Sequence, residues 1–124
     1  MVCLDTNVII DLLGGEKLIH DLLKSYGDAE QMSITAITEY ELLKPNNKIG
    51  IDKTTKLLEN FTIYEFNENA AIKSASIFRE LKGKGKMINE NDILIAGIAL
   101  ANKEILITRD KKFEHLGIDS IKIV

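Results

Sequence analysis

Four acidic residues stand at the ends of predicted strands or near the starts of predicted helices: Asp5, Glu41, Asp92 and Asp110. In a parallel sheet these positions lie at one edge, where ligands bind in open α/β proteins. Carboxylates gathered there repel each other strongly unless a cation lies among them. Oxygen ligands favour Mg²⁺ or Mn²⁺, and one cysteine with two histidines offers no zinc cluster. The sequence therefore predicts a Mg²⁺ or Mn²⁺ site.

Such a site can hydrolyse a phosphodiester bond, because a divalent cation polarises the phosphate and lowers the pKa of a bound water. Asn7 and Thr108 each lie two residues from one of the acids, and we expect them to orient the carboxylates or the water. Basic side chains flank the same edge and can contact backbone phosphates. The candidates are Arg109, Lys111 and Lys86, with Lys82, Lys84 and Lys112 nearby.

Glu41 has two interpretations from spacing alone. It stands three residues after Thr38, which is the spacing of a capping box, in which the glutamate side chain bonds back to the N–H of the cap residue. Glu39 is a second candidate for the acid of the site. The spacing leaves a metal ligand and a helix cap equally open.

The other acids also have structural alternatives. Asp5 can be a polar strand end, although a carboxylate after Val-Cys-Leu needs a partner. Asp92 can favour the dipole of its helix, and Asp110 can form a turn. Lysines and arginines near loops are usually only solvated. The combination of four acids, rather than any one of them, favours a functional site.

Short apolar runs alternate with segments of helical period, which is the pattern of βα units around a mostly parallel sheet. The predicted strands are residues 2–4, 32–37, 62–66, 104–108 and 121–124. Two helices are predicted between the first two strands: one is capped by Asn7 and ends before Gly14-Gly15, and the next has Leu18, Ile19, Leu22, Leu23 and Tyr26 on its inner face. Two more follow at residues 38–44 and 52–60. Then come a helix that is capped by Asn67 and ends at 83–86, a buried helix at 92–101, and a short helical turn around Phe113 and Leu116. Residues 46–48 should form a surface turn.

The composition limits the class of protein. With 124 residues and 45% hydrophobic content, the chain is long enough for one domain, residues 1–124, and too short for two. The longest apolar runs are far below the roughly 20 residues of a membrane span, and we expect no membrane segment and no secretion signal, and hence a cytoplasmic protein. The net charge of −3 argues against a protein that coats nucleic acid through bulk positive charge, so any such contact should be local.

Four motifs together resemble one family. They are LDTNV at residues 4–8, ITEYELL at 37–43, NDILIA at 91–96 and ITRDKKF at 107–113. In this order and spacing the chain resembles PIN domains over its whole length, and in particular the VapC-type toxins of bacterial and archaeal toxin–antitoxin pairs. Many relatives carry glycine where Lys44-Pro45 stands here, so the loop after Glu41 departs from the family pattern.

The resemblance implies a three-layer α/β/α sandwich, a quartet of acids that binds divalent metal, and endonucleolytic cleavage of RNA. It places the acids on Asp5, Glu41 rather than Glu39, Asp92 and Asp110, with Asn7 and Thr108 in support. It also implies a homodimer and inhibition by a cognate antitoxin protein.

Other functions remain open at this stage. An RNA-processing or DNA-directed PIN-like nuclease would carry the same acids. A phosphatase or receiver domain also places aspartate after the first strand, but such phosphatases typically have Asp-x-Asp, and here Asn7 occupies the second position. A non-catalytic binding module on the same fold could lose the acids freely, yet all four are present.

Overall fold

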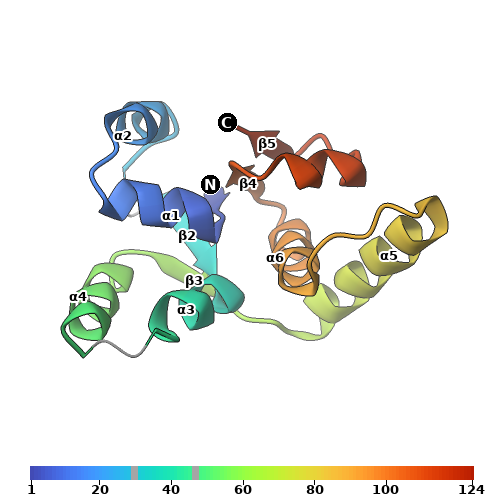
Figure 1. Ribbon diagram of the computed structural model, residues 1–124, viewed down its shortest axis with the longest axis horizontal. Helices are drawn as coiled ribbons and strands as arrows, with labels where there is room; N and C mark the ends of the chain where they lie inside the picture. Colours follow the sequence, from blue (N-terminus) through green and yellow to red (C-terminus); the bar gives the residue numbers. More distant parts are fainter. Residues whose placement is uncertain (29–30, 46–47) are drawn as a thin grey trace.

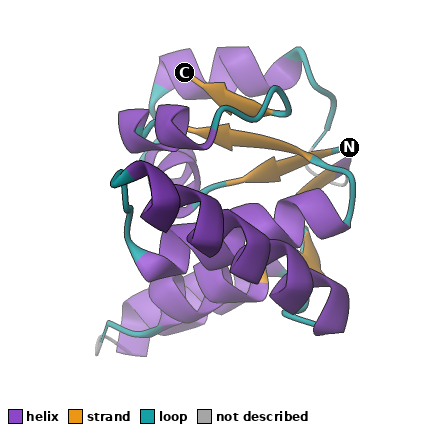
Figure 2. Ribbon diagram, turned by 90° about the vertical axis from the view of Figure 1, so that its right-hand side faces the viewer, coloured by secondary structure: helices purple, strands orange, loops and turns teal. Residues whose placement is uncertain are grey.

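Five parallel strands form the centre of the molecule. The computed structural model describes residues 1–28, 31–45 and 48–124, and in these ranges the strand order is β3-β2-β1-β4-β5. The strands are β1 (Val2–Leu4), β2 (Met32–Thr35), β3 (Thr62–Tyr64), β4 (Ile105–Thr108) and β5 (Ile121–Ile123). All four pairings between neighbours are parallel, and the strand arrows in Figure 2 point the same way. This confirms the predicted sheet.

The helices follow the predicted order along the chain. They are α1 (Thr6–Leu13), α2 (Lys17–Lys24), α3 (Ala36–Leu43), α4 (Lys48–Leu58), α5 (Glu68–Lys84), α6 (Glu90–Ala101) and the 3₁₀ helix η2 (Lys111–Leu116). The predicted Asn67 cap is confirmed, because its side chain accepts a 3.0 Å hydrogen bond from the Ala70 N–H. None of the helices in the described ranges is long and apolar enough to cross a membrane.

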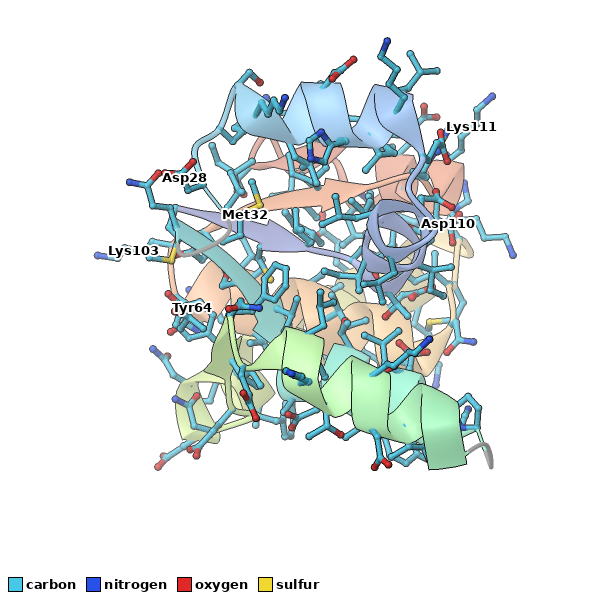
Figure 3. All side chains as sticks on the ribbon, turned by 90° about the vertical axis from the view of Figure 1, so that its left-hand side faces the viewer. Asp28, Met32, Tyr64, Lys103, Asp110 and Lys111 are labelled. Atoms are coloured by element: carbon cyan, nitrogen blue, oxygen red, sulfur yellow. The ribbon has the colours of Figure 1, made fainter. Side chains whose placement is uncertain are left out.

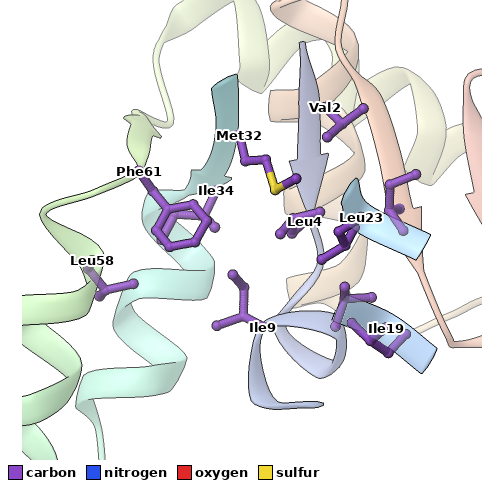
Figure 4. Close-up of a cluster of buried hydrophobic side chains, with 11 residues drawn as sticks. Val2, Leu4, Ile9, Ile19, Leu23, Met32, Ile34, Leu58 and Phe61 are labelled. Atoms are coloured by element: carbon purple, nitrogen blue, oxygen red, sulfur yellow. The ribbon is translucent and has the colours of Figure 1, made fainter. Parts of the chain in front are cut away.

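Helices cover both faces of the sheet and make the predicted three layers (Figure 1). One core joins α1, α2 and α4 to the sheet, and Figure 4 shows side chains such as Ile9, Leu23 and Leu58 converging on it. The other core joins α5, α6 and η2 to the opposite face, through side chains such as Ile77, Ile95 and Phe113. The central strands β1 and β4 are short and almost wholly buried, as expected when both faces of a parallel sheet are covered.

Helix α6 is the predicted buried helix. Six of its residues are buried, because the helix lies between α5 and the sheet. Its Gly97 lets α5 approach closely: a Cβ at this position would collide with the Oγ of Ser74. That serine donates a 3.5 Å hydrogen bond to the carbonyl of Ile93. The packing of α5 therefore fixes the helix that carries Asp92.

Two predicted helix caps are wrong by a few residues. Asp5, rather than Asn7, caps α1, since its Oδ1 accepts a hydrogen bond from the Thr6 N–H at 2.8 Å. Helix α3 begins at Ala36 with Thr35 as its cap, so Thr38 lies inside the helix and β2 ends earlier than predicted. In both cases the polar residue nearest the strand end satisfies the first free N–H groups.

Part of the predicted inner face of α2 is also wrong. Ile19 and Leu23 are buried, but Leu18 is 75% exposed and Tyr26 follows the end of the helix at the surface. The helix has only eight residues, and its narrow apolar stripe reaches the core at two buried positions. Of the predicted turn, residues 46–47 lie outside the described part of the chain, and Lys48 begins α4.

Candidate active site

The topology brings the four predicted acids to the carboxyl edge of the sheet. Asp5 directly follows β1, and Asp110 follows β4, which pairs with β1. Glu41 lies on α3, the helix after β2, and Asp92 lies in the first turn of α6. Figure 3 shows Asp110 and Lys111 at one end of the molecule, with Met32 at the start of β2 toward the other.

Asp5 is the most deeply buried of these acids, with 3% of its surface exposed. Burial raises the pKa of its carboxyl above the ordinary value, and the charges of Glu41 and Asp110 raise it further. Two hydrogen bonds act in the opposite direction: Thr108 donates its hydroxyl proton at 2.7 Å, and the Thr6 N–H donates at 2.8 Å. The protein thus buries a carboxylate and supplies donors that hold it in place.

The pKa of Asp92 is affected by all three of the other acids. The pKa of its carboxyl is raised to about 6, chiefly by burial and further by the charges of Asp5, Asp110 and Glu41. The charge of Lys112 acts in the opposite direction and lowers it. Because every one of the predicted acids contributes, the four carboxylates share one electrostatic environment.

Glu41 is not part of a capping box. Its Oε1 accepts a 2.7 Å hydrogen bond from the hydroxyl of Thr6, on α1, instead of reaching back to the N–H of Thr38. The capping interpretation fails because the helix starts earlier and Thr35 already caps it. Glu41, and not Glu39, is the glutamate whose charge raises the pKa of Asp5 and Asp92.

Both predicted supporting residues make contacts at this edge. Thr108 bonds to Asp5 and also accepts the Asp110 N–H at 3.1 Å, so one hydroxyl links the segments of two acids. Asn7 accepts a hydrogen bond from the Arg109 N–H at 3.2 Å and thereby ties α1 to the loop after β4.

Sequence reasoning missed Thr6, which follows Asp5 directly and bonds to Glu41. Its only sequence signal is its position inside the Asp-Thr-Asn motif. Because Glu41 is 35 residues away, local spacing could not reveal the contact.

The predicted phosphate-binding residues differ in their surroundings. The guanidinium of Arg109 already pairs with Asp11 at 2.9 Å and with Glu16 at 2.7 Å. Lys86 and Lys111 are exposed, and the structure records no ion pair for either of them in the described part of the chain. The lysines are therefore better placed than Arg109 to meet a polyanion.

The donor set suits a hard divalent cation. All four acids offer oxygen, as do the neighbouring threonines and Asn7, and the mutual repulsion seen at Asp92 is what a bound cation would relieve. Across the described ranges, however, no three acidic, histidine or cysteine side chains are already assembled to hold an ion. Several of the carboxylate oxygens instead accept hydrogen bonds from neighbours.

The fold and this edge define a class: α/β proteins with a parallel sheet, helices on both faces and a cluster of acids at the carboxyl ends of the strands. Within this class the chain belongs to the PIN domain family, which it matches over residues 2–119.

Known proteins of this family are similar over most of the chain. Ribonuclease VapC3 of Methanocaldococcus jannaschii is 36% identical over 99 residues, which cover 77% of this chain and 94% of that protein. Ribonuclease VapC2 of Haemophilus influenzae is 30% identical, with 91% of this chain and 89% of that protein covered. A solved toxin–antitoxin complex from Klebsiella pneumoniae superposes with a TM-score of 0.81 at 25% identity, covering 98% of this chain and 96% of that chain.

Proposed function

We propose that this protein is a Mg²⁺- or Mn²⁺-dependent endoribonuclease and the toxin of a type II toxin–antitoxin pair, which inhibits translation and growth by cleaving RNA. One observation carries the proposal: three acids from three other segments all raise the pKa of Asp92. Membership of the PIN domain family and the ribonuclease names of similar proteins support the same activity.

Asp5, Glu41, Asp92 and Asp110 would hold the cation. A bound Mg²⁺ or Mn²⁺ supplies positive charge that polarises the phosphodiester and favours in-line attack by water. The chain's own residues prepare this site. Thr108 and the Thr6 N–H hold the Asp5 carboxylate, and Lys111 and Lys86 would contact backbone phosphates of the RNA.

The proposal includes two protein partners. We infer a cognate antitoxin protein, because a solved structure that resembles this chain is a toxin–antitoxin complex. We also infer a homodimer, which the resemblance to VapC-type toxins implies. An enzyme that cleaves RNA of its own cell would work in the cytoplasm. Light scattering of the purified chain, alone and with the product of the neighbouring gene, tests both partners.

The decisive experiment is cleavage of a labelled mixture of single-stranded RNA by the wild type and by Asp92→Asn, each with Mn²⁺, Mg²⁺ or EDTA. We expect cleavage by the wild type with either cation, no cleavage in EDTA, and a large loss in the variant. Asp119→Asn, at an exposed position on the loop before β5, is the matched control and should cleave normally.

Other outcomes would redirect the proposal. Faster cleavage of DNA than of RNA would identify a DNA-directed enzyme of the same fold. Cleavage confined to one structured precursor would identify an RNA-processing enzyme. Growth arrest that persists with Asp5→Asn in the cell would show that toxicity does not need the acids, and would support a binding module.

A further inference from the structure

Three threonine hydroxyls form a continuous chain that ends at Glu41. The hydroxyl of Thr35 lies 3.4 Å from that of Thr38, which lies 3.0 Å from that of Thr6, and Thr6 lies 2.7 Å from the glutamate Oε1. Thr35 and Thr38 are completely buried, and Thr6 is partly buried. These hydrogen-bonded hydroxyls connect the end of β2, helix α3 and the start of α1.

The direction of the protons in this chain follows from the chemistry of its ends. An ionised carboxylate can only accept, so the proton of Thr6 points at Glu41. The oxygen of Thr6 must then accept from Thr38, whose oxygen accepts in turn from Thr35. Thr35 is free to donate because its own oxygen accepts the backbone N–H of Thr38 at 3.1 Å. All three hydroxyl dipoles therefore point toward the carboxylate, and bonds aligned in this way strengthen one another.

Helix capping does not account for two of these hydroxyls. Thr35 caps α3 and Asp5 caps α1, so neither helix start needs the side chain of Thr38 or Thr6. Thr38 is buried, and a buried hydroxyl without a partner is costly. In the described part of the chain, the hydroxyls of Thr38 and Thr6 are both satisfied along the path to Glu41. The hydrogen-bonded hydroxyls therefore serve the carboxylate of Glu41 rather than the helix ends.

We infer that Thr6 and Thr38 are positioning residues, which fix the carboxylate of Glu41 at the acidic edge so that it is ready to bind the cation. This inference rests on the proposed function. Glu41 carries three side-chain torsions, and a hydrogen bond from a buried network restricts them before the cation arrives. Partners of metal ligands commonly change metal affinity about 10–100-fold when they are removed.

The test measures Mn²⁺ affinity by calorimetry, which needs no substrate and no activity. Thr6→Val keeps the shape of the side chain and removes the donor, and should weaken Mn²⁺ binding about 10-fold or more. Thr6→Ser keeps the hydroxyl and should bind within about threefold of the wild type. Thr38→Val should weaken binding by a smaller factor, since it removes only the donor to Thr6. Thr62→Val, at an exposed position on β3, is the control and should change nothing.

A second readout separates positioning from direct catalysis. With Thr6→Val, the dependence of RNA cleavage on Mn²⁺ concentration should shift to higher concentration, and the rate should recover at saturating Mn²⁺. A rate that stays low at saturation would overturn the positioning role. Circular dichroism confirms that each variant is folded, and Thr6→Ala replaces Thr6→Val if the latter is not.

Failure of this inference differs from failure of the proposed function. If the wild type neither binds Mn²⁺ nor cleaves RNA, the proposed function is wrong and the inference falls with it. If the wild type does both and Thr6→Val binds Mn²⁺ as tightly, only the positioning role is overturned.

Discussion

The hydroxyl of Thr108 donates a 2.7 Å hydrogen bond to Oδ2 of Asp5, across a separation of 103 residues. The contact joins the ends of β1 and β4, which pair in the sheet. It is one of two hydrogen bonds that lower the pKa of a carboxyl otherwise raised by burial.

Thr108→Val should lower the free energy of unfolding by about 1–3 kcal/mol at pH 7 in EDTA, because it leaves a buried carboxylate with one donor fewer. Urea denaturation of the wild type, Thr108→Val, Asp5→Asn and the double variant forms a complete cycle. We expect a coupling of at least about 1 kcal/mol between the two positions. Additivity within about 0.5 kcal/mol would show that the bond does not stabilise the fold.

Asp92→Asn should stabilise the cation-free protein in a way that depends on pH. The pKa of Asp92 is about 6 in the folded protein, above its ordinary value of 3.8, so the folded state holds this proton more tightly than the unfolded state does. Ionisation of Asp92 therefore costs stability, and the cost grows as the pH rises from about 4 to about 6. Well below pH 3.8 both states carry the proton and the cost disappears.

We accordingly expect Asp92→Asn to exceed the wild type by about 1 kcal/mol in unfolding free energy at pH 7.5, and to equal it near pH 3.5. Solvent screens this partly exposed carboxylate, which keeps the difference small. Urea denaturation in EDTA at the two pH values measures the difference. Mn²⁺ should reverse the order at pH 7.5, because the cation stabilises the folded wild type more than the variant. Equal stabilities at both pH values would contradict the raised pKa.

Gly97→Ala should destabilise the protein although alanine favours helices. The added Cβ would meet the backbone N and the Cβ of Ser74, each at 2.9 Å, so α5 and α6 must move apart. We expect a loss of about 1–3 kcal/mol in unfolding free energy. Gly83→Ala in α5 is the matched control: a Cβ there meets nothing within 4 Å, and the change should stabilise the fold by up to about 1 kcal/mol. Equal effects of the two changes would show that close packing at Gly97 is unimportant.

Lys111 and Lys86 should contribute more to RNA binding than Arg109 does. Fluorescence polarisation with the inactive Asp92→Asn protein measures affinity for a short RNA at several salt concentrations. Replacing both lysines with alanine should lower the slope of log affinity against log salt by about one to two, as expected when phosphate contacts are lost.

Arg109→Ala should leave that slope nearly unchanged, because the guanidinium pairs with Asp11 and Glu16. It should lower the unfolding free energy only slightly, because solvent screens these exposed pairs, with a smaller effect still at high salt. A slope that falls as far for Arg109→Ala as for the lysines would show that the ion pairs open to admit RNA.

The sequence by itself determined the parallel sheet and the location of its acidic edge. Val2–Leu4 and Ile105–Thr108 are short buried runs, and the acid after each can lie only at the carboxyl end of its strand. The residues of α6 are apolar on nearly every side, so this helix had to be covered on both faces, with Asp92 in its first turn. These features depend on the local pattern of apolar and polar residues, which can be read directly from the sequence.

Only the tertiary structure decided which side chains meet at that edge. Spacing favoured a capping box for Glu41 as much as a site acid, and the position of α1 beside α3 brings Thr6 to the glutamate instead. The guanidinium of Arg109 likewise meets Asp11 and Glu16, which lie more than 90 residues earlier in the chain. Side-chain contacts at such separations depend on the order of the strands and on how the helices pack against the sheet. Local periodicity in the sequence does not specify either of these.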